Sequence, residues 1–223
     1  KGAVNAMIFS RPPSSRDPAL YTASSDGTVR AWDVVRYRNF RTYVPNREGV
    51  SFQSLAVDPS GEIIVASSFQ APFYIYMWNA QTAQLISELT SHTGPITGLS
   101  FSSHHQLASC SWDNTARVWD VFGKGAPCEV IDHEREVTCL AYSPAAQGTL
   151  ATGDVMGVLR FWDINGENTG TQLLEIETAR DWGADKQKEG VVLSNIKWTP
   201  DGQCVLVSAK NKSFVHMYHV EQR

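Results

Sequence analysis

Residues 109–120 read SCSWDNTARVWD, and this stretch decides the fold. Two runs that suit extended strands, Gln106–Cys110 and Ala116–Trp119, stand on either side of a short group of turn-forming residues. The second run closes with a Trp-Asp pair. The stretch therefore predicts two antiparallel strands joined by a tight turn at Ser111–Thr115.

A tryptophan that closes a short apolar run recurs along the chain. The spacings between four such tryptophans are 46, 41 and 43 residues. A fifth segment has Tyr218 in that place, 56 residues on, or 42 once the fourteen residues of the polar stretch Glu177–Gly190 are set aside. The four Trp segments are Val29–Asp33, Ile75–Asn79, Arg117–Asp120 and Arg160–Asp163. Repeats of about 40–45 residues with a Trp-Asp pair are typical of WD-repeat proteins, which the sequence resembles along almost its whole length.

Each repeat is consistent with four short strands. In the third repeat these are Ile96–Phe101, Gln106–Cys110, Ala116–Trp119 and a strand near Cys128–Ile131. The strands are rich in β-branched and aromatic residues. Turn residues such as Asp58–Gly61, in which proline presets φ and glycine accepts a positive φ, separate them. Apolar residues on both strand faces predict sheets that pack on a neighbour through each face.

The strand count gives four full blades and three strands of a fifth, from an inner strand at Ala3–Phe9 to a last strand at Phe214–Val220. We therefore expect an all-β fold, a WD40-repeat β-propeller that forms a partial ring of four full blades plus most of a fifth. Because closed propellers complete one blade from both termini, and the sequence lacks an initiator Met, we expect a piece of a longer protein. The expected blades are approximately 1–47, 48–90, 91–132, 133–176 and 191–223, with an insertion at 177–190.

The third repeat carries the most complete polar signature. The residues His92, Ser109 or Ser111, Asp113 and Trp119 match the hydrogen-bonded structural tetrad of WD blades. A buried imidazole, hydroxyl, carboxylate and indole each need a partner, and a closed chain of hydrogen bonds satisfies all of them. A catalytic Ser-His-Asp triad is the alternative. We reject it because these residues stand at the structural positions of the repeat and no G-x-S-x-G motif occurs.

The tetrad is incomplete in the other repeats. The first keeps Asp26 without an upstream histidine, and the fourth keeps His133 but has Met156 in place of the aspartate. The second and fifth have Pro72 and Lys212 at that position. We therefore expect these blades to depend more on apolar packing.

The composition is that of a folded domain, with 42% hydrophobic and 19% charged residues. No apolar run approaches the roughly 20 residues of a transmembrane helix. Residues 1–50 carry eight Lys and Arg against four Asp and Glu, and the remainder carries eleven against nineteen, so the first fifth is basic and the rest acidic. Such a surface suits protein partners, and its basic part suits a polyanion. The four cysteines form no C-x-x-C pair, which favours buried reduced thiols: Cys110, Cys128, Cys139 and Cys204.

Among WD-repeat proteins, the sequence resembles the periodic tryptophan protein 2 family. The segments that carry the resemblance are Asp26–Asp33, Arg36–Thr42, Leu55–Ile63, Ser111–Asp120 and Phe214–Val220. It is dense over residues 20–122 and thin over 123–190. The resemblance implies a nuclear, nucleolar subunit of the UTP-B complex of the small-subunit processome, which contacts pre-rRNA and the box C/D small nucleolar ribonucleoprotein. It also implies tandem propellers of about seven blades each.

A basic and aromatic segment follows the first Trp. Arg36, Arg38 and Arg41 are interleaved with Tyr37 and Phe40, which provides the chemistry for phosphate contact and base stacking. RNA contact, contact with a neighbouring protein, and an outer strand with solvated arginines remain open alternatives.

Two further tryptophans are candidate protein contacts. Trp112 lies in the tight turn of the third repeat, where it either serves a partner or lies flat on its own blade. Trp182 is the large apolar residue of the insertion, and we expect it to fold back onto the fourth blade rather than to anchor a partner. Arg30, Arg117 and Arg160 each stand two residues before a repeat Trp, so we expect them to be structural.

The leading functional hypothesis is a non-catalytic scaffold in ribosome biogenesis, bound to protein subunits of a large ribonucleoprotein particle. A WD-repeat adaptor in another complex, such as a ubiquitin ligase substrate receptor or a coat subunit, is the second. An enzyme that uses a central channel is the third, but the inner strands are largely Val, Ala, Leu and Ser. We expect no cofactor, no membrane contact and no small-molecule substrate. We also expect no metal site, because His104-His105 and the His216/His219 pair lack further ligands.

Overall fold

The computed structural model describes residues 2–10, 18–122, 127–144, 148–164, 170–178, 191–210 and 212–220. In these residues the chain forms nineteen β-strands, grouped into five antiparallel sheets. The first sheet contains β1 (Val4–Ser10), β2 (Ala19–Ser24), β3 (Val29–Asp33) and β4 (Arg38–Tyr43), and the second contains β5 (Phe52–Val57), β6 (Ile63–Ser68), β7 (Ile75–Asn79) and β8 (Leu85–Leu89). The third contains β9 (Ile96–Phe101), β10 (Gln106–Ser111), β11 (Thr115–Asp120) and β12 (Pro127–Asp132).

The fourth sheet contains β13 (Val137–Tyr142), β14 (Thr149–Asp154), β15 (Val158–Asp163) and β16 (Thr171–Glu177). The fifth contains β17 (Leu193–Trp198), β18 (Cys204–Ala209) and β19 (Val215–His219). Strands pair in chain order within every sheet. The prediction of four full blades and three strands of a fifth is therefore confirmed.

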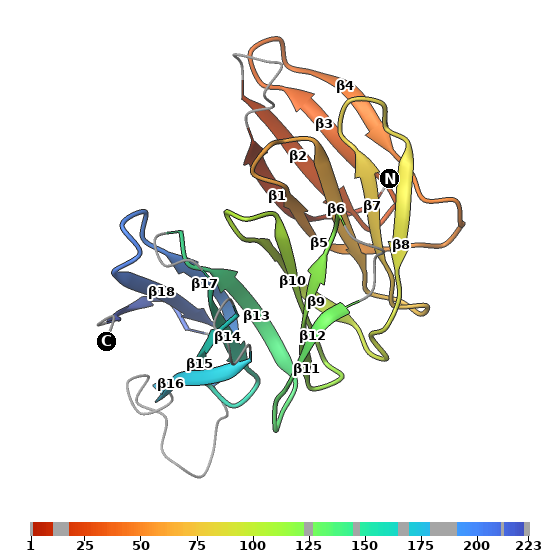
Figure 1. Cartoon of the computed structure of the whole chain (residues 1–223). Helices are drawn as coiled ribbons and strands as arrows, with labels where there is room; N and C mark the ends of the chain where they lie inside the picture. The colour runs from red at the N-terminus through yellow and green to blue at the C-terminus, as the bar shows by residue number, and fades with distance from the viewer. Residues whose placement is uncertain are drawn as a thin grey trace.

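The five sheets follow one another around an arc, with the first and the last at its two ends (Figure 1). The first strand of each sheet lies beside the first strand of the next, in the order β1, β5, β9, β13 and β17. This is the arrangement of blades around the axis of a propeller. The chain is thus a WD-repeat β-propeller segment, as the repeat predicts.

Apolar side chains fill the space between successive sheets. A separate cluster of buried residues lies at each of the four junctions. The repeat tryptophan of a blade faces the preceding blade, as Trp78 shows by its place in the cluster with Tyr21 and Tyr43 of the first sheet, with the Tyr43 ring centroid 6.2 Å away. Trp78 and Trp119 are completely buried. Burial of both sheet faces explains why apolar and polar residues do not alternate strictly along these strands.

The sheets at the two ends of the arc carry exposed apolar side chains. Met7 and Phe9 of β1 are more than half exposed, as are Val215 and Met217 of β19. Met7 is paired with Thr22, and Leu99 of β9 is paired with Ser109, which like Thr22 accepts the N–H of the repeat tryptophan. Leu99 is buried in the junction between the second and third sheets. The end faces therefore have the chemistry of the faces that the other sheets bury.

Polar side chains near the axis link three of the four pairs of neighbouring inner strands. Asn5 Nδ2 donates to the carbonyl oxygen of Phe52 at 2.7 Å, and Thr97 Oγ1 donates to that of Val137 at 3.0 Å. Thr138 Oγ1 donates to the carbonyl oxygen of Leu193 at 2.6 Å. In each case the donor is the second residue of an inner strand and the acceptor is the first residue of the next one. These bonds fix the relative height of neighbouring blades, and so the positions of their loops.

Candidate functional site

A closed chain of hydrogen bonds occupies the third blade. Trp119 Nε1 donates to Ser109 Oγ at 2.9 Å, and Ser109 Oγ lies 2.7 Å from His92 Nε2. His92 Nδ1 lies 2.7 Å from Asp113 Oδ2. Because an ionised carboxylate can only accept, Nδ1–H donates to Asp113, and Nε2 of the neutral imidazole accepts the hydroxyl proton of Ser109. The serine of the tetrad is therefore Ser109, while Ser111 Oγ accepts the backbone N–H of Asp113 at 3.1 Å.

The tetrad is structural. Burial lowers the pKa of His92, and the nearby Asp113 carboxylate, which acts in the opposite direction, does not reverse this. Burial acts to raise the pKa of Asp113, but hydrogen bonds from His92 and Thr115 bring it well below its usual range. The side chain of His92 and all of Ser109 are inaccessible to solvent. A buried hydroxyl that already accepts an indole N–H cannot reach a substrate, so a catalytic triad is excluded here.

The fourth blade keeps the chain but ends it on the backbone. Trp162 Nε1 donates to Thr152 Oγ1 at 2.8 Å, and Thr152 Oγ1 lies 2.9 Å from His133 Nε2. His133 Nδ1 lies 3.1 Å from the carbonyl oxygen of Ile131, which takes the place of the missing carboxylate. Met156 stands where the third blade has its aspartate. Burial lowers the pKa of His133 to about 4. The imidazole is therefore neutral at pH 7.

A buried ion pair also stabilises the fourth blade. Arg160 Nη1 donates to Asp154 Oδ2 at 2.8 Å, and Arg160 Nε donates to Glu175 Oε2 at 2.9 Å. Asp154 also accepts two backbone N–H groups, those of Met156 and Val158. Polar groups thus replace the missing aspartate in this blade, and its greater dependence on apolar packing stays a prediction. The recurrence of arginine before the repeat Trp was the sequence signal for this pair.

The first two blades satisfy their tryptophans in simpler ways. Trp32 Nε1 donates to Thr22 Oγ1 at 2.8 Å, without a histidine. Trp78 Nε1 donates to the carbonyl oxygen of Val44 in the preceding blade at 3.1 Å. Asp26 pairs with Arg30 at 3.2 Å rather than with a histidine. The tetrad is thus complete in the third blade alone among the described residues.

The basic and aromatic segment lies on the hairpin between β3 and β4 and along β4 itself. The structure divides its arginines. Arg36 Nη1 pairs with Asp33 Oδ2 at 2.8 Å. Arg41 Nη1 donates to the carbonyl oxygen of Ala80 at 2.6 Å, which ties the first blade to the second. Arg38 is exposed at the start of β4. Arg41 is therefore a structural residue, whereas Arg36 and Arg38 are both exposed, and Arg36 is paired with Asp33.

The aromatic residues of the hairpin are available to a partner. Tyr37 is 91% exposed and has a φ of +52°, in the left-handed region. Ala83 and Gly170 have φ angles of +59° and +77° in the corresponding hairpins of the second and fourth blades, so the loop shape requires this conformation. A bulky residue pays roughly 1–2 kcal/mol for it. Phe40 is 43% exposed, with the Arg41 guanidinium 5.8 Å from its ring centroid.

Trp112 lies in the turn between β10 and β11, on the opposite face of the propeller from the Tyr37 hairpin. Its ring meets that of Phe69 edge-on, with centroids 5.6 Å apart, and it remains 43% exposed. Trp112 therefore packs on the second blade rather than flat on its own. Trp182, the other candidate protein contact, lies outside the described residues.

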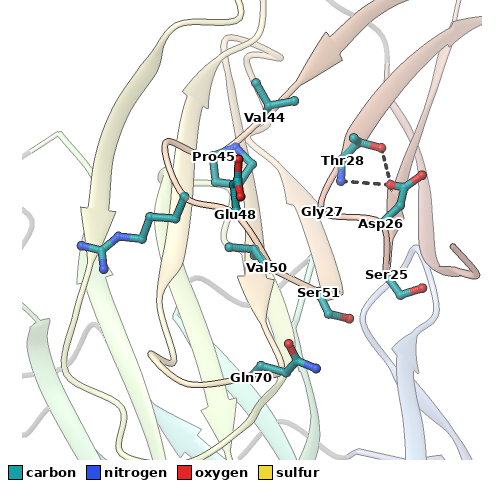
Figure 2. A pocket seen from close by; sticks show the side chains of 12 residues that line it. Ser25, Asp26, Gly27, Thr28, Val44, Pro45, Glu48, Val50, Ser51 and Gln70 are labelled. Atoms are coloured by element: carbon teal, nitrogen blue, oxygen red, sulfur yellow. Dashed lines mark hydrogen bonds between the residues drawn. The ribbon is translucent and has the colours of Figure 1, made fainter. Parts of the chain in front are cut away.

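A pocket of about 510 Å³ lies between the first and second blades, on the same face as Trp112. Figure 2 shows the side chains of the β2–β3 turn, of the connection from β4 to β5, and of Gln70 around it. Its lining includes Asp26, Arg47, Glu48, Ser51 and Gln70. The sequence pattern does not predict this pocket. Its only signal was the Pro45-to-Gly49 connection, which turn residues make irregular.

The described part of the chain contains no group of side chains that could form a metal site, and its buried cysteine thiols are shielded from solvent. There, no three His, Cys, Asp or Glu side chains are grouped so that they could hold a metal ion. Cys110 and Cys139 are free and buried, and burial raises the pKa of both thiols, that of Cys110 to about 12. Cys204 is free and half-buried. No helix among the described residues is long and apolar enough to cross a membrane.

Comparisons with known proteins agree with the repeat. The family described as WD domain, G-beta repeat, matches residues 1–33 and 83–120. The periodic tryptophan protein 2 homologue of Dictyostelium discoideum is 34% identical over the whole chain, which covers 24% of that protein. The homologue of Schizosaccharomyces pombe is 39% identical over 84% of the chain, and that of Mus musculus is 35% identical over 87% of the chain. The matched region is 22% of the length of each of these two proteins. The chain thus spans about a quarter of the length of the curated relatives it matches.

Proposed function

The chain belongs to the WD-repeat proteins and is similar over most of its length to periodic tryptophan protein 2, and we propose that it is a non-catalytic scaffold in ribosome biogenesis. In this role it takes part in small-subunit processome assembly and pre-rRNA processing, in the nucleolus, together with the box C/D small nucleolar ribonucleoprotein. The support for this role is the similarity to relatives of that name. The support for a scaffold is the stack of blades, in which the repeat tryptophans of the first four blades donate their N–H groups to acceptors inside the fold.

The observation that carries the proposal is Tyr37. Its side chain is almost fully exposed, and its backbone has a left-handed conformation in which a glycine would be less strained than a tyrosine. Stability therefore does not explain a tyrosine at this position, whereas contact with a partner does. Together with the exposed guanidinium of Arg38, it offers a ring for stacking and a charge for a phosphate. We infer that this pair is the contact with the ribonucleoprotein particle.

The test is crosslinking of the full-length protein in cells. We expect crosslinks to precursor rRNA and nucleolar proteins. Crosslinks confined to other RNAs and proteins would refute the role in ribosome biogenesis and favour an adaptor in another complex, such as a ubiquitin ligase substrate receptor or a coat subunit.

The contact itself is tested with substitutions on one hairpin. The double variant Tyr37→Gly, Arg38→Ala should reduce sedimentation of the protein with large particles several-fold, without loss of folded protein. The matched control is Gln81→Ala, on the corresponding hairpin of the second blade. Arg41 is left intact, because its bond to Ala80 holds two blades together. Unchanged incorporation of the double variant would eliminate the hairpin as the contact.

A further inference from the structure

The pocket between the first two blades is electrically negative. Hydrogen bonds from Thr28 and Ser24, with a smaller contribution from the charge of Arg30, lower the pKa of Asp26, so this carboxylate is ionised at pH 7. Glu48 is exposed at the pocket and has no hydrogen bond or ion pair with any described residue. One of the two lining carboxylates is therefore without a counter-charge.

The lining cation does not neutralise Glu48. Arg47 pairs with Glu88 of β8 at 3.6 Å, and its guanidinium lies 5.0 Å from the ring centroid of Tyr74. Both contacts lie on the second blade, so its charge is already compensated there. The pocket can therefore accept a positive charge, and it repels a phosphate.

An aromatic surface continues from the pocket. The backbone N–H of Phe69 donates to the carbonyl oxygen of Ser51 at 3.0 Å, and Ser51 lines the pocket. The next residue, Gln70, lines it as well. Phe69 in turn contacts the exposed ring of Trp112. A negatively charged pocket and a pair of aromatic rings thus form one continuous surface across three blades.

We propose that this surface binds an extended segment of a protein partner, with a Lys or Arg side chain in the pocket and a large apolar side chain against Phe69 and Trp112. Charge complementarity selects the occupant. A cation gains from Glu48 and Asp26, and an apolar side chain gains from covering an exposed indole. RNA does not fit, because its phosphates would face both carboxylates.

The surface is independent of the role in ribosome assembly. It lies on the face opposite to Tyr37 and Arg38, and it would serve a basic segment from any partner. Loss of crosslinks to nucleolar particles would therefore leave the surface standing, and its own failure would leave the Tyr37 hairpin standing.

The first experiment places a photoreactive amino acid, benzoylphenylalanine, at Gln70 of the full-length protein in cells. We expect the crosslinked material to be protein, and the crosslinked segments to carry a Lys or Arg within a few residues of a large apolar residue. The same photoreactive residue at exposed Gln81, on the other face, is the control and should capture different segments. Capture of RNA, capture of acidic segments, or no capture at Gln70 would each overturn the proposal.

The second experiment measures the affinity of a synthetic peptide with the captured sequence by fluorescence anisotropy. Glu48→Gln should weaken binding about twofold to fivefold and reduce its dependence on salt, because one exposed ion pair is lost. Trp112→Ala should weaken binding about tenfold or more. Glu62→Gln removes the same charge from an exposed position on the opposite face and should change nothing. Equal affinity for the Glu48→Gln and unsubstituted proteins would refute the assignment of the pocket.

Discussion

The neutral state of His133 makes the stability of the protein depend on pH in a predictable direction. Its pKa is about 4 in the folded chain, because it is buried and donates to a carbonyl rather than to a carboxylate. In the unfolded chain a histidine titrates near pH 6.5. Between these two values the unfolded state binds more protons than the folded state. The contribution is therefore fully present above about pH 6.5 and is lost as the pH falls towards 4.

The magnitude follows from the two pKa values. A shift of about 2.5 units corresponds to about 3 kcal/mol in the limit of low pH, and to about 2 kcal/mol at pH 5. The substitution His133→Gln removes the titration but keeps an amide oxygen that can accept the hydroxyl of Thr152. Its cost in free energy of unfolding should therefore be about 2 kcal/mol smaller at pH 5 than at pH 7.

The assay is urea unfolding at both pH values, followed by tryptophan fluorescence, for the original and the His133→Gln proteins. Comparing the two proteins cancels the titration of all groups that they share. An NMR titration of the imidazole would give the pKa directly. If the cost of the substitution is the same at pH 5 and pH 7, the histidine is not held neutral and the assignment of the hydrogen-bonded chain in the fourth blade is wrong.

Three further predictions concern the same fold. Met156→Asp places a carboxylate where the third blade has one, so an NMR titration should show that the pKa of His133 rises above 4. The free energy of unfolding should then fall less between pH 7 and pH 5. Arg160→Leu should lower the free energy of urea unfolding by about 3–5 kcal/mol, because it leaves Asp154 buried without its cation. In a protein that already carries Asp154→Asn, the same substitution should lower it by at least about 1 kcal/mol less. Tyr37→Gly should leave the unfolding free energy unchanged or raise it by up to about 1 kcal/mol, since it relieves a left-handed backbone, and a fall of more than that would show that the ring stabilises the fold.

The blades could be predicted from the sequence because several independent features of each repeat indicate the same structure. The spacing of the tryptophans, the turn residues and the apolar runs all indicate the same strand boundaries, and the structure places β10 and β11 within one residue of those expected. The tetrad of the third blade was equally accessible, since His92 and Asp113 occupy fixed positions relative to Trp119. What a repeat encodes locally can be inferred from its pattern.

Contacts between blades were harder to predict, because they depend on which loops meet across a junction. Arg41 resembled its neighbours Arg36 and Arg38 in the sequence, yet it is the one that reaches the second blade. The replacement of the tetrad aspartate by the carbonyl of Ile131 could not be predicted either, since a backbone acceptor leaves no trace in the residue types. The pocket is also formed by loops from two repeats, neither of which is unusual alone.

One strand separates the two proposed contacts. Tyr37 precedes β4 and Val44, at the edge of the pocket, follows it, so they lie about 20 Å apart along an extended strand. The same strand is fixed to the second blade by Arg41 and by the hydroxyl of Tyr43, both of which donate to Ala80. The spacing between the two contacts is therefore set by the sheet rather than by a flexible linker. This is the physical sense in which the first two blades can act as a scaffold: they hold a site for a basic protein segment and an aromatic hairpin at a constant separation, on opposite faces. It also means that substitutions at Tyr37 and at Glu48 test different contacts, because no described side chain belongs to both.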